Sequence, residues 1–321
     1  MKKIYYWSPC LNKVGTYKST INSAISLSRF AKKSYQIKII NTCGEWNDCK
    51  ELFRSNNIEV IHFGYNYFKY LPKIGFIGSR ISYFVIILTS IIPLIKLLNR
   101  DKPEFLIMHL LTLLPLLLAR FLNNYTKFIL RISGYPKLNF LRKSAWKLSA
   151  NYLFKITCPS KDLMFQLIKK KVFLKEKLYF LPDPILNINE IIEKKKEPIN
   201  EYDYKKKYFI SVGRLTKQKN FDYLINEFKL FFDNNSDYNL LIFGEGELKD
   251  ELKNTIKKYH LTDNIFLMGH SNNVYKYMIK AEAFILSSLW EDPGFVLIEA
   301  AMCNLFIVSS NCKNGPTEFL D

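Results

Sequence analysis

A chain of 321 residues, of which 48% are hydrophobic, can fill the cores of two domains, and this composition excludes an intrinsically disordered protein. The net charge of +18 is unevenly spread, because residues 1–185 carry 30 Lys and Arg against 9 Asp and Glu, whereas residues 186–321 carry 17 against 20. The basic first half predicts an anionic partner, and nucleic acid, an anionic membrane surface and a phosphate-bearing substrate all remain open.

The six cysteines form no CxxC pair and have no metal-ligand spacing with the four histidines, so we expect neither a zinc site nor a disulfide framework. Free cysteines suit the reducing cytoplasm, where we expect the protein to lie. At the N-terminus, Ser8-Pro9 ends an apolar run that is too short for the core of a signal peptide, and this run predicts a strand.

The first half alternates short β-branched or aromatic runs with longer helical patterns. A helix is predicted over 17–33, and strands are predicted at 3–7, 36–40, 60–63, 105–109, 127–131 and 155–158. Strands that recur with helices between them predict a parallel, doubly wound sheet.

An uncharged and mostly apolar run, residues 81–95, lies between Arg80 and Lys96. A membrane-spanning helix needs roughly 18–20 such residues, and Pro93 interrupts this run. We therefore favour a buried or interfacial helix, with a transmembrane span as the alternative.

Two prolines, Pro182 and Pro184, mark a linker, so we expect domains at 1–185 and 186–321. The lysine-rich run 187–207 is predicted to be an exposed connection. A second alternation predicts strands at 208–212, 238–243, 265–268, 283–287 and 306–309, and helices at 221–232, 248–259, 274–280 and 295–302. The expected fold class is α/β, with two Rossmann-like doubly wound parallel sheets.

The first stretch that could carry chemistry is 211–220, where Gly213 ends a strand and a helix follows. Arg214 and Lys219 stand at the helix entrance, where backbone N–H groups favour an anion. The stretch suits a diphosphate, and a pair of solvated cations is the alternative. A nearby glycine turn, 244–246, is typical of a tight turn before a helix with acidic first residues.

The second stretch is 287–300, in which a strand, a loop with Glu291 and a helix from Phe295 follow one another. The N–H groups of Gly294 and Phe295 are expected to face a ligand. Glu299 lies in an otherwise apolar helix, where an unpaired charge is costly to bury, so hydroxyls or other donors must hold it.

These stretches resemble the retaining glycosyltransferases of family 4, which share the GT-B fold. Four motifs occur in the family's order and spacing: the Gly213-Arg214…Lys219-Asn220 loop, the Gly244-Glu245-Gly246 turn, the Glu291…Glu299 pair followed by Ala300, and Asn314-Gly315-Pro316-Thr317-Glu318. The resemblance implies that Arg214 and Lys219 hold the diphosphate of a sugar donor. Two cations on the leaving group would make a metal ion unnecessary.

The resemblance also implies contacts with the rest of the donor. Glu299 would accept hydrogen bonds from the ribose hydroxyls, and the nucleotide base would lie near His270. Glu291, with the backbone at Gly294 and Phe295, would contact the transferred sugar.

In the first half the resemblance is weaker, as expected where the acceptor binds. Gly15 lies in a loop that resembles the family's glycine-bearing loop, and His109 follows a strand where related enzymes carry a histidine that faces the reacting sugar. A satisfied core histidine is the alternative for His109. The basic stretch 137–147, with Phe140 and Trp146, predicts either a membrane-facing amphipathic segment or a solvated helix face.

We therefore expect a retaining, metal-independent hexosyltransferase without a cofactor, which uses a UDP-sugar rather than a GDP-sugar. Its acceptor would be a saccharide or a lipid-linked sugar of cell-envelope polysaccharide, such as lipopolysaccharide. The protein would sit on the inner face of the plasma membrane and bind no nucleic acid. A basic nucleic-acid-binding protein and a catalytically impaired donor-binding fragment are the alternatives, the latter because the chain ends at Asp321, soon after the last motif, and the second domain looks truncated.

Overall fold

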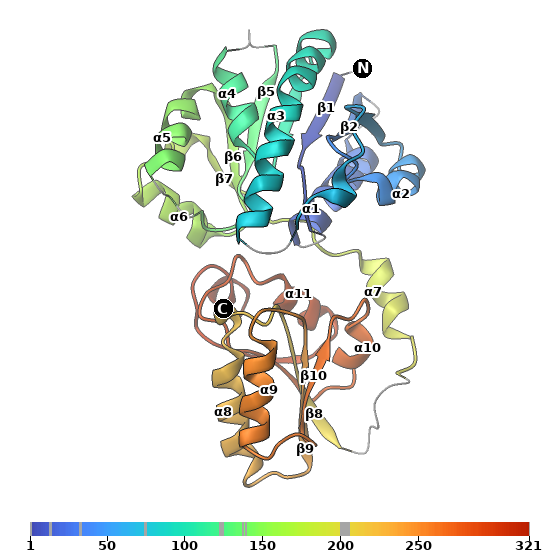
Figure 1. Ribbon diagram of the computed structural model, residues 1–321, viewed down its shortest axis with the longest axis vertical. Coiled ribbons are helices and arrows are strands. Elements are labelled where there is room, and N and C mark those ends of the chain that lie inside the picture. The colour runs from blue at the N-terminus through green and yellow to red at the C-terminus, as the bar shows by residue number, and fades with distance from the viewer. Residues whose placement is uncertain are drawn as a thin grey trace. The chain divides into compact units, whose positions relative to one another are not determined.

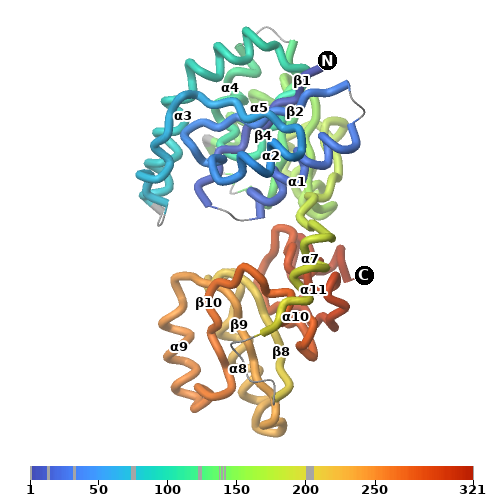
Figure 2. The backbone as a smooth tube through the Cα atoms, turned by 90° about the vertical axis from the view of Figure 1, so that its right-hand side faces the viewer, coloured from blue at the N-terminus to red at the C-terminus, as the bar shows by residue number. Residues whose placement is uncertain are grey.

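The computed structural model describes residues 2–12, 15–31, 34–73, 76–121, 125–136, 138, 140–199 and 206–320. The chain divides into two compact units, Met1–Ile185 (unit 1) and Leu186–Asp321 (unit 2). Each unit is a parallel β-sheet with helices on both faces (Figures 1 and 2).

Unit 1 is built on a seven-stranded sheet in the order β3-β2-β1-β4-β5-β6-β7, and all neighbouring strands are parallel. The strands are β1 (Lys2–Trp7), β2 (Tyr35–Asn41), β3 (Glu59–His62), β4 (Phe105–Met108), β5 (Lys127–Arg131), β6 (Leu153–Cys158) and β7 (Leu178–Phe180). The six strands predicted from the sequence are present, with bounds that differ by two residues at most. The short β7 was not predicted, because three residues before a proline turn carry little periodicity.

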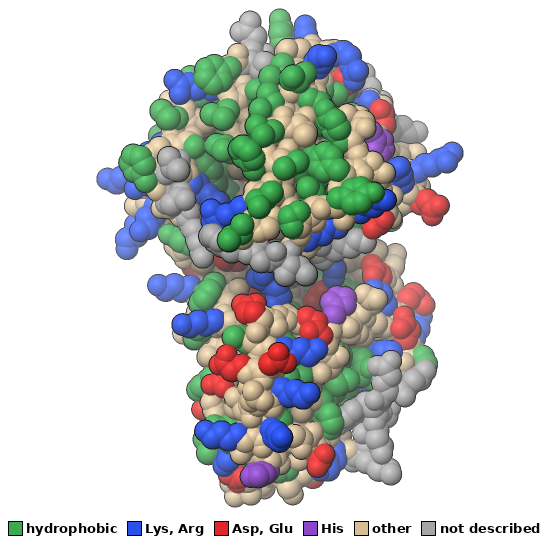
Figure 3. Space-filling model, viewed as in Figure 1, with side chains coloured by type: hydrophobic (Ala, Val, Ile, Leu, Met, Phe, Trp, Pro, Cys, Tyr) green, Lys and Arg blue, Asp and Glu red, His purple; other side chains and the backbone are tan. Residues whose placement is uncertain are grey.

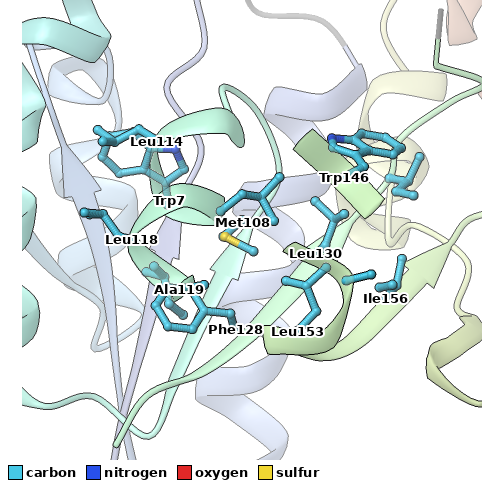
Figure 4. Packing of buried hydrophobic residues seen from close by; sticks show 14 of the residues in the cluster. Trp7, Met108, Leu114, Leu118, Ala119, Phe128, Leu130, Trp146, Leu153 and Ile156 are labelled. Atoms are coloured by element: carbon cyan, nitrogen blue, oxygen red, sulfur yellow. The ribbon is translucent and has the colours of Figure 1, made fainter. Parts of the chain in front are cut away.

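Helices cover both faces of this sheet. They are α1 (Gly15–Phe30), α2 (Lys50–Ser55), α3 (Phe76–Asp101), α4 (Leu113–Phe121), α5 (Phe140–Ser149) and α6 (Lys161–Lys169), with single 3-10 turns η1 (Asn47–Cys49), η2 (Phe68–Tyr70), η3 (Ala150–Tyr152) and η4 (Lys175–Lys177). Helices α3, α4, α5 and α6 share one hydrophobic core with the sheet. This core includes Trp7, Met108 and Trp146 (Figure 4). A second core joins α1 and α2 to the opposite face.

Helix α3 extends well beyond the predicted run 81–95 and continues through Pro93. The expectation that Pro93 interrupts the run was therefore wrong. A proline inside a helix costs about 3 kcal/mol, and the packing of the next turn offsets this cost, because Leu94 is fully buried and Leu97 and Leu98 are 4% exposed. Within the described residues, Ile77–Asp101 is long and apolar enough to cross a membrane, although 33% of its most apolar window is buried inside unit 1.

Unit 2 is built on a five-stranded parallel sheet in the order β10-β9-β8-β11-β12. Its strands are β8 (Lys207–Val212), β9 (Tyr238–Phe243), β10 (Ile265–Gly269), β11 (Ala283–Leu286) and β12 (Phe306–Ser309). Its helices are α7 (Ile188–Lys195), η5 (Lys217–Lys219), α8 (Phe221–Phe232), α9 (Lys249–Lys258), α10 (Tyr275–Met278), α11 (Phe295–Met302) and α12 (Pro316–Leu320). α7, α10 and α11 pack on one face, and α8 and α9 pack on the other.

The lysine-rich run 187–207 is not simply an exposed connection. It contains α7, whose Ile191 is 2% exposed and packs into the core of unit 2. The Asn187 side chain caps this helix by accepting from the amide of Glu190 at 3.4 Å. In the sequence, the isoleucines of α7 have a helical spacing, but they stand among lysines, which favoured the prediction of an exposed segment. Residues 200–205 of the run lie outside the described residues.

In both sheets the strand order reverses once, between β1 and β4 in unit 1 and between β8 and β11 in unit 2. Ligands of open α/β sheets bind beyond the carboxyl ends of the strands at such a reversal, which is called a topological switch point. The residues that follow β1, β4, β8 and β11 are therefore the first place to look for a site.

Candidate functional site

Two glycines of the 244–246 turn bring it into backbone contact with the loop after β8. A Cβ atom on Gly244 would lie 1.8 Å from the carbonyl oxygen of Gly213, and one on Gly246 would lie 2.2 Å from that of Leu215. Gly244 also has a φ of +142°, which side chains rarely adopt. The turn therefore supports the loop that carries Arg214, a role that the sequence did not suggest.

Replacing Gly246 with alanine is expected to lower the free energy of unfolding by about 1–3 kcal/mol, because the new methyl group would displace the loop after β8. Urea unfolding of the full chain measures this loss. Gly64→Asn is the control, since nothing lies within 4 Å of the Gly64 Cβ position and asparagine tolerates its positive φ of +87°. If Gly246→Ala lowered the free energy of unfolding no more than Gly64→Asn does, this would contradict the close contact between Gly246 and the Leu215 carbonyl.

Lys219 and Glu291 form a buried ion pair that joins the loops after β8 and β11. Lys219 Nζ lies 2.5 Å from Glu291 Oε1, and the two side chains are 13% and 5% exposed. The Ser288 hydroxyl donates to the same carboxylate oxygen at 2.5 Å. Gly213 leaves room for the lysine stem, because a Cβ there would lie 2.8 Å from Lys219 Cε. The pair spans the switch point of unit 2.

The loop before α11 is held by the last motif of the sequence. A Cβ on Gly315 would lie 1.9 Å from the carbonyl oxygen of Pro293, and Asn314 Nδ2 donates to Asp292 Oδ1 at 3.3 Å. Gly294 is the N-cap of α11, with a φ of +82°, and the helix begins at Phe295. The first amides of the helix are thereby presented at the same edge of the sheet as the ion pair, and such amides attract anions.

Glu299 lies one turn into α11, and the Tyr275 hydroxyl donates to its Oε1 at 3.0 Å. Burial, and then the charge of Glu299, raise the pKa of Tyr275 well above its usual range. The phenol therefore keeps its proton and remains a donor. The sequence predicted that a hydroxyl or another donor must hold the Glu299 carboxylate in its apolar helix, and the Tyr275 hydroxyl is such a donor.

Arg214 and His270 are exposed and follow the carboxyl ends of β8 and β10. They lie at the same edge of the sheet as the Lys219–Glu291 pair. In the part of the chain that the structure describes, neither makes a hydrogen bond or ion pair with that pair. Of the predicted donor-site residues, the structure thus brings Lys219 and Glu291 into contact and places the others around them on one edge.

In unit 1, His109 follows β4 and is 5% exposed. Its Nδ1 lies 3.0 Å from Thr20 Oγ1 on α1, the helix that Gly15 begins, so this contact spans the switch point of unit 1. Burial, and then the charge of Arg131, lower the pKa of His109 to about 4, against the opposite effect of Asp183. The imidazole is therefore neutral at neutral pH.

Arg131, at the end of β5, forms a buried ion pair with Asp183, and their side chains are 6% and 3% exposed. Its guanidinium also donates to Ser23 Oγ at 2.8 Å and to Ser19 Oγ at 3.2 Å. Asp183 belongs to the proline turn that the sequence marks as a linker. In the structure this turn is tied to the sheet of unit 1.

The second half of the chain matches a family of known proteins. Residues 192–321 match the family model described as Glycosyl transferases group 1. The matched region contains the Lys219–Glu291 pair and Glu299. An uncharacterised glycosyltransferase of Methanocaldococcus jannaschii is 30% identical over 256 residues, which are 73% of this chain and 62% of the relative.

A second relative is the N-acetylgalactosamine-N,N'-diacetylbacillosaminyl-diphospho-undecaprenol 4-alpha-N-acetylgalactosaminyltransferase of Campylobacter jejuni. It is 32% identical over 210 residues, which are 63% of this chain and 56% of the relative. The chain thus spans less than two thirds of the length of both relatives.

Solved structures share the fold over the whole chain. The crystal structure of a glycosyltransferase from Rickettsia africae superposes with a TM-score of 0.72 and 15% identity, over 100% of this chain and 82% of that one. An Anabaena protein in complex with UDP superposes with a TM-score of 0.68 and 12% identity, over 100% and 83%. Residues 192–321 are thus similar to the group 1 glycosyl transferases, and the chain as a whole has the GT-B fold of two parallel-sheet units.

Sequence reasoning missed four polar residues at the two switch points: Ser288, Tyr275, Thr20 and Arg131. Ser288 could have been found, because it stands three residues before Glu291 at the end of a strand. The other three are ordinary residues of helices or strands in the sequence. Only the order of the strands brings them to the switch points.

Proposed function

We propose that this protein is a glycosyltransferase that moves a hexose from a nucleotide diphosphate sugar to a saccharide or a lipid-linked sugar, with retention at the anomeric carbon, during cell-envelope polysaccharide synthesis. The observation that carries the proposal is the buried Lys219–Glu291 pair at the switch point of unit 2, within the region that matches the family. The Campylobacter jejuni relative, whose name states a diphospho-undecaprenol acceptor, supports the acceptor class.

Unit 2 would bind the donor. Arg214 and Lys219 would face the diphosphate, Glu299 would accept from the ribose hydroxyls, and the base would lie by His270. Both donors to the Glu291 carboxylate in the described residues reach Oε1, so Oε2 is available to a hydroxyl of the transferred sugar. The Anabaena protein of the same fold holds UDP, and this supports a UDP-sugar as donor.

The cations give this site a way to stabilise the leaving group without a metal ion or a cofactor. Charge that develops on the departing diphosphate would be met by Arg214, by Lys219 and by the amides at Gly294 and Phe295. The acceptor would attack from the face that the diphosphate leaves, and a phosphate oxygen would take the acceptor proton. Attack on that face retains the anomeric configuration.

An exposed apolar surface on unit 1 supports a peripheral position on the inner face of the plasma membrane. Along α3 the exposed residues recur every three or four positions, so they lie on one side of the helix, and α4 adds three more. Hydrophobic side chains gather over this face of unit 1 in Figure 3. The surface consists of Ile77, Ile81, Phe84, Leu88 and Ile92 on α3 and Leu113, Leu117 and Phe121 on α4, which are 44–74% exposed.

The sequence predicted a membrane-facing segment at 137–147, but only part of that segment is exposed, so we assign the membrane contact mainly to the surface of α3 and α4. Trp146 of that segment is 8% exposed and packs on Phe173, with ring centroids 5.2 Å apart, so it cannot reach a membrane. Phe140 is 82% exposed and remains available, whereas Lys137 lies outside the described residues. The net positive charge of residues 1–185 would add attraction to anionic lipids.

Release of UDP from a panel of UDP-sugars, with and without a saccharide acceptor, tests the proposal. Arg214→Ala and Glu299→Gln are each expected to reduce turnover about ten- to hundredfold, because each removes a charge-assisted contact with the donor. Lys217→Ala is the control, since Lys217 is an exposed cation of the same loop. Full turnover by both site variants would overturn the assignment of the site, and UDP binding without turnover would leave only the donor-binding function.

A further inference from the structure

The buried phenol of Tyr275 joins two helices of unit 2 through a polar contact. Tyr275 is the first residue of α10 and is 7% exposed. Its hydroxyl donates to Oε1 of Glu299, which stands among the apolar residues of α11, 24 positions further along the chain. The phenol is therefore a fixed donor to the carboxylate that we assign to the ribose.

The start of α10 is held in place by Asn273, which is 7% exposed. Its Oδ1 accepts from the backbone amides of Tyr275 at 3.1 Å and of Lys276 at 3.4 Å. Its Nδ2 donates to the carbonyl oxygen of Lys194 in α7 at 2.8 Å, and Lys194 Nζ donates to the carbonyl oxygen of Asn272 at 3.1 Å. Two hydrogen bonds thus tie the loop after β10 to α7, and Tyr275 begins α10 from a fixed position.

The hydroxyl and the carboxylate are carried by helices that share one core. α7, α10 and α11 lie side by side in unit 2 (Figures 1 and 2). The Tyr275 ring belongs to their common core, together with Ile191 of α7 and with Ala300, which follows Glu299 in the chain. Because this packing sets the separation of the two groups, the hydrogen bond forms before any ligand binds.

A carboxylate that is held in this way suits the recognition of a diol. A glutamate side chain has several rotatable bonds, and ordering it only when a ligand arrives reduces affinity. An ionised carboxylate also has about four lone-pair sites. Glu299 can therefore accept from Tyr275 and still accept from the two hydroxyls of a ribose.

We propose that Tyr275 is a positioning residue, which holds the Glu299 carboxylate in the orientation that binds the ribose and so makes the site selective for nucleotides with both ribose hydroxyls. The inference rests on the proposed function, from which Glu299 takes its contact with the ribose. It deepens that function, because it names the residue that makes the contact selective. Tyr275 acts through Glu299 and not on the substrate itself.

The binding of two nucleotides to the full chain, measured by titration calorimetry, tests this inference without turnover. UDP carries both ribose hydroxyls and 2′,3′-dideoxy-UDP carries neither, so the ratio of their dissociation constants reports the ribose contact. The unmodified chain is expected to bind UDP at least about tenfold more tightly than 2′,3′-dideoxy-UDP, because the hydroxyls donate to a charged group.

The variant Tyr275→Phe removes the hydroxyl and keeps the ring. It is expected to weaken UDP about five- to tenfold and to leave 2′,3′-dideoxy-UDP within about twofold, since the dideoxy ribose has no hydroxyl for Glu299 to bind. Tyr208→Phe is the matched control. Tyr208 is 2% exposed in the same core, and its hydroxyl donates to the Tyr277 carbonyl at 2.7 Å. This control also loses a buried hydrogen bond, but it should keep the ratio of the unmodified chain.

A purely structural role of Tyr275 would change the affinities for both nucleotides alike. An unchanged ratio in Tyr275→Phe therefore overturns the inference. In a Glu299→Ala background, Tyr275→Phe should change the affinity for UDP by no more than about twofold, because the carboxylate that it positions is absent. A five- to tenfold loss in that background, as estimated above for the single variant, would show that Tyr275 acts through another group and would also overturn the inference.

Failure of the proposed function gives a different result. If the unmodified chain binds no UDP, the donor site fails and the inference falls with it. If UDP binds about tenfold more tightly than 2′,3′-dideoxy-UDP and Tyr275→Phe keeps that ratio, the donor site stands and only the role of Tyr275 is wrong. Circular dichroism checks that each variant is folded.

Discussion

Replacing Lys219 with methionine is expected to lower the free energy of unfolding of the full chain by about 3–5 kcal/mol, because the change leaves Glu291 buried without its cation. The Glu291 side chain is only 5% exposed, so water cannot replace the ammonium group, and the Ser288 hydroxyl is the one other donor to its carboxylate within the described residues. Urea unfolding followed by circular dichroism measures the loss.

The double variant Lys219→Met/Glu291→Gln separates the pair from its surroundings. It removes both charges and is expected to be more stable than Lys219→Met alone, since a neutral amide costs less to bury than a carboxylate. Lys229→Met is the control, because the Lys229–Asp233 pair is exposed and such pairs contribute about 0–1 kcal/mol. Equal losses for Lys219→Met and Lys229→Met would show that the switch-point pair is not buried in solution.

The second large expected effect is a loss of folding stability at low pH, and it comes from His109. Its pKa is about 4 in the folded protein and about 6.5 in an unfolded chain, so the unfolded chain takes up a proton first. The stability that His109 contributes is complete above pH 6.5 and is lost as the pH falls toward 4. This difference in proton binding is expected to lower the free energy of unfolding by about 3 kcal/mol between pH 7 and pH 4. The His109→Gln variant should not show this loss.

Burial is the largest cause of the lowered pKa of His109, and two charged groups near the imidazole modify it. The positive Arg131 lowers the pKa of His109, and Asp183, which pairs with Arg131, raises it by a smaller amount. Urea unfolding at pH 7, 5.5 and 4 gives the slope of the free energy of unfolding against pH, for the unmodified chain and for His109→Gln. His260→Asn is the control, since His260 is exposed, and it should leave the slope unchanged. Equal slopes for all three proteins would mean that His109 is not buried in its neutral form.

Local sequence patterns were sufficient for most of the architecture. The helices at 221–232 and 295–302 and the strands at 127–131, 238–243 and 306–309 have the predicted bounds, because each pattern repeats along its own segment. In parallel sheets that are buried on both faces, strands are continuous apolar runs, which a sequence shows directly. The exceptions are α7, whose isoleucines stand among lysines, and α3, which tertiary packing carries through Pro93.

The sequence by itself determined the two parallel α/β sheets, the basic character of the first half and the glycine and glutamate motifs of the second. Only the tertiary structure decided that Lys219 meets Glu291 across 72 residues, that Thr20 meets His109 across 89, and that Tyr275 holds Glu299. The physical reason is that periodicity is a property of one segment, whereas a contact at a switch point depends on which strands become neighbours. That order is set by the packing of all the helices and strands of a unit together.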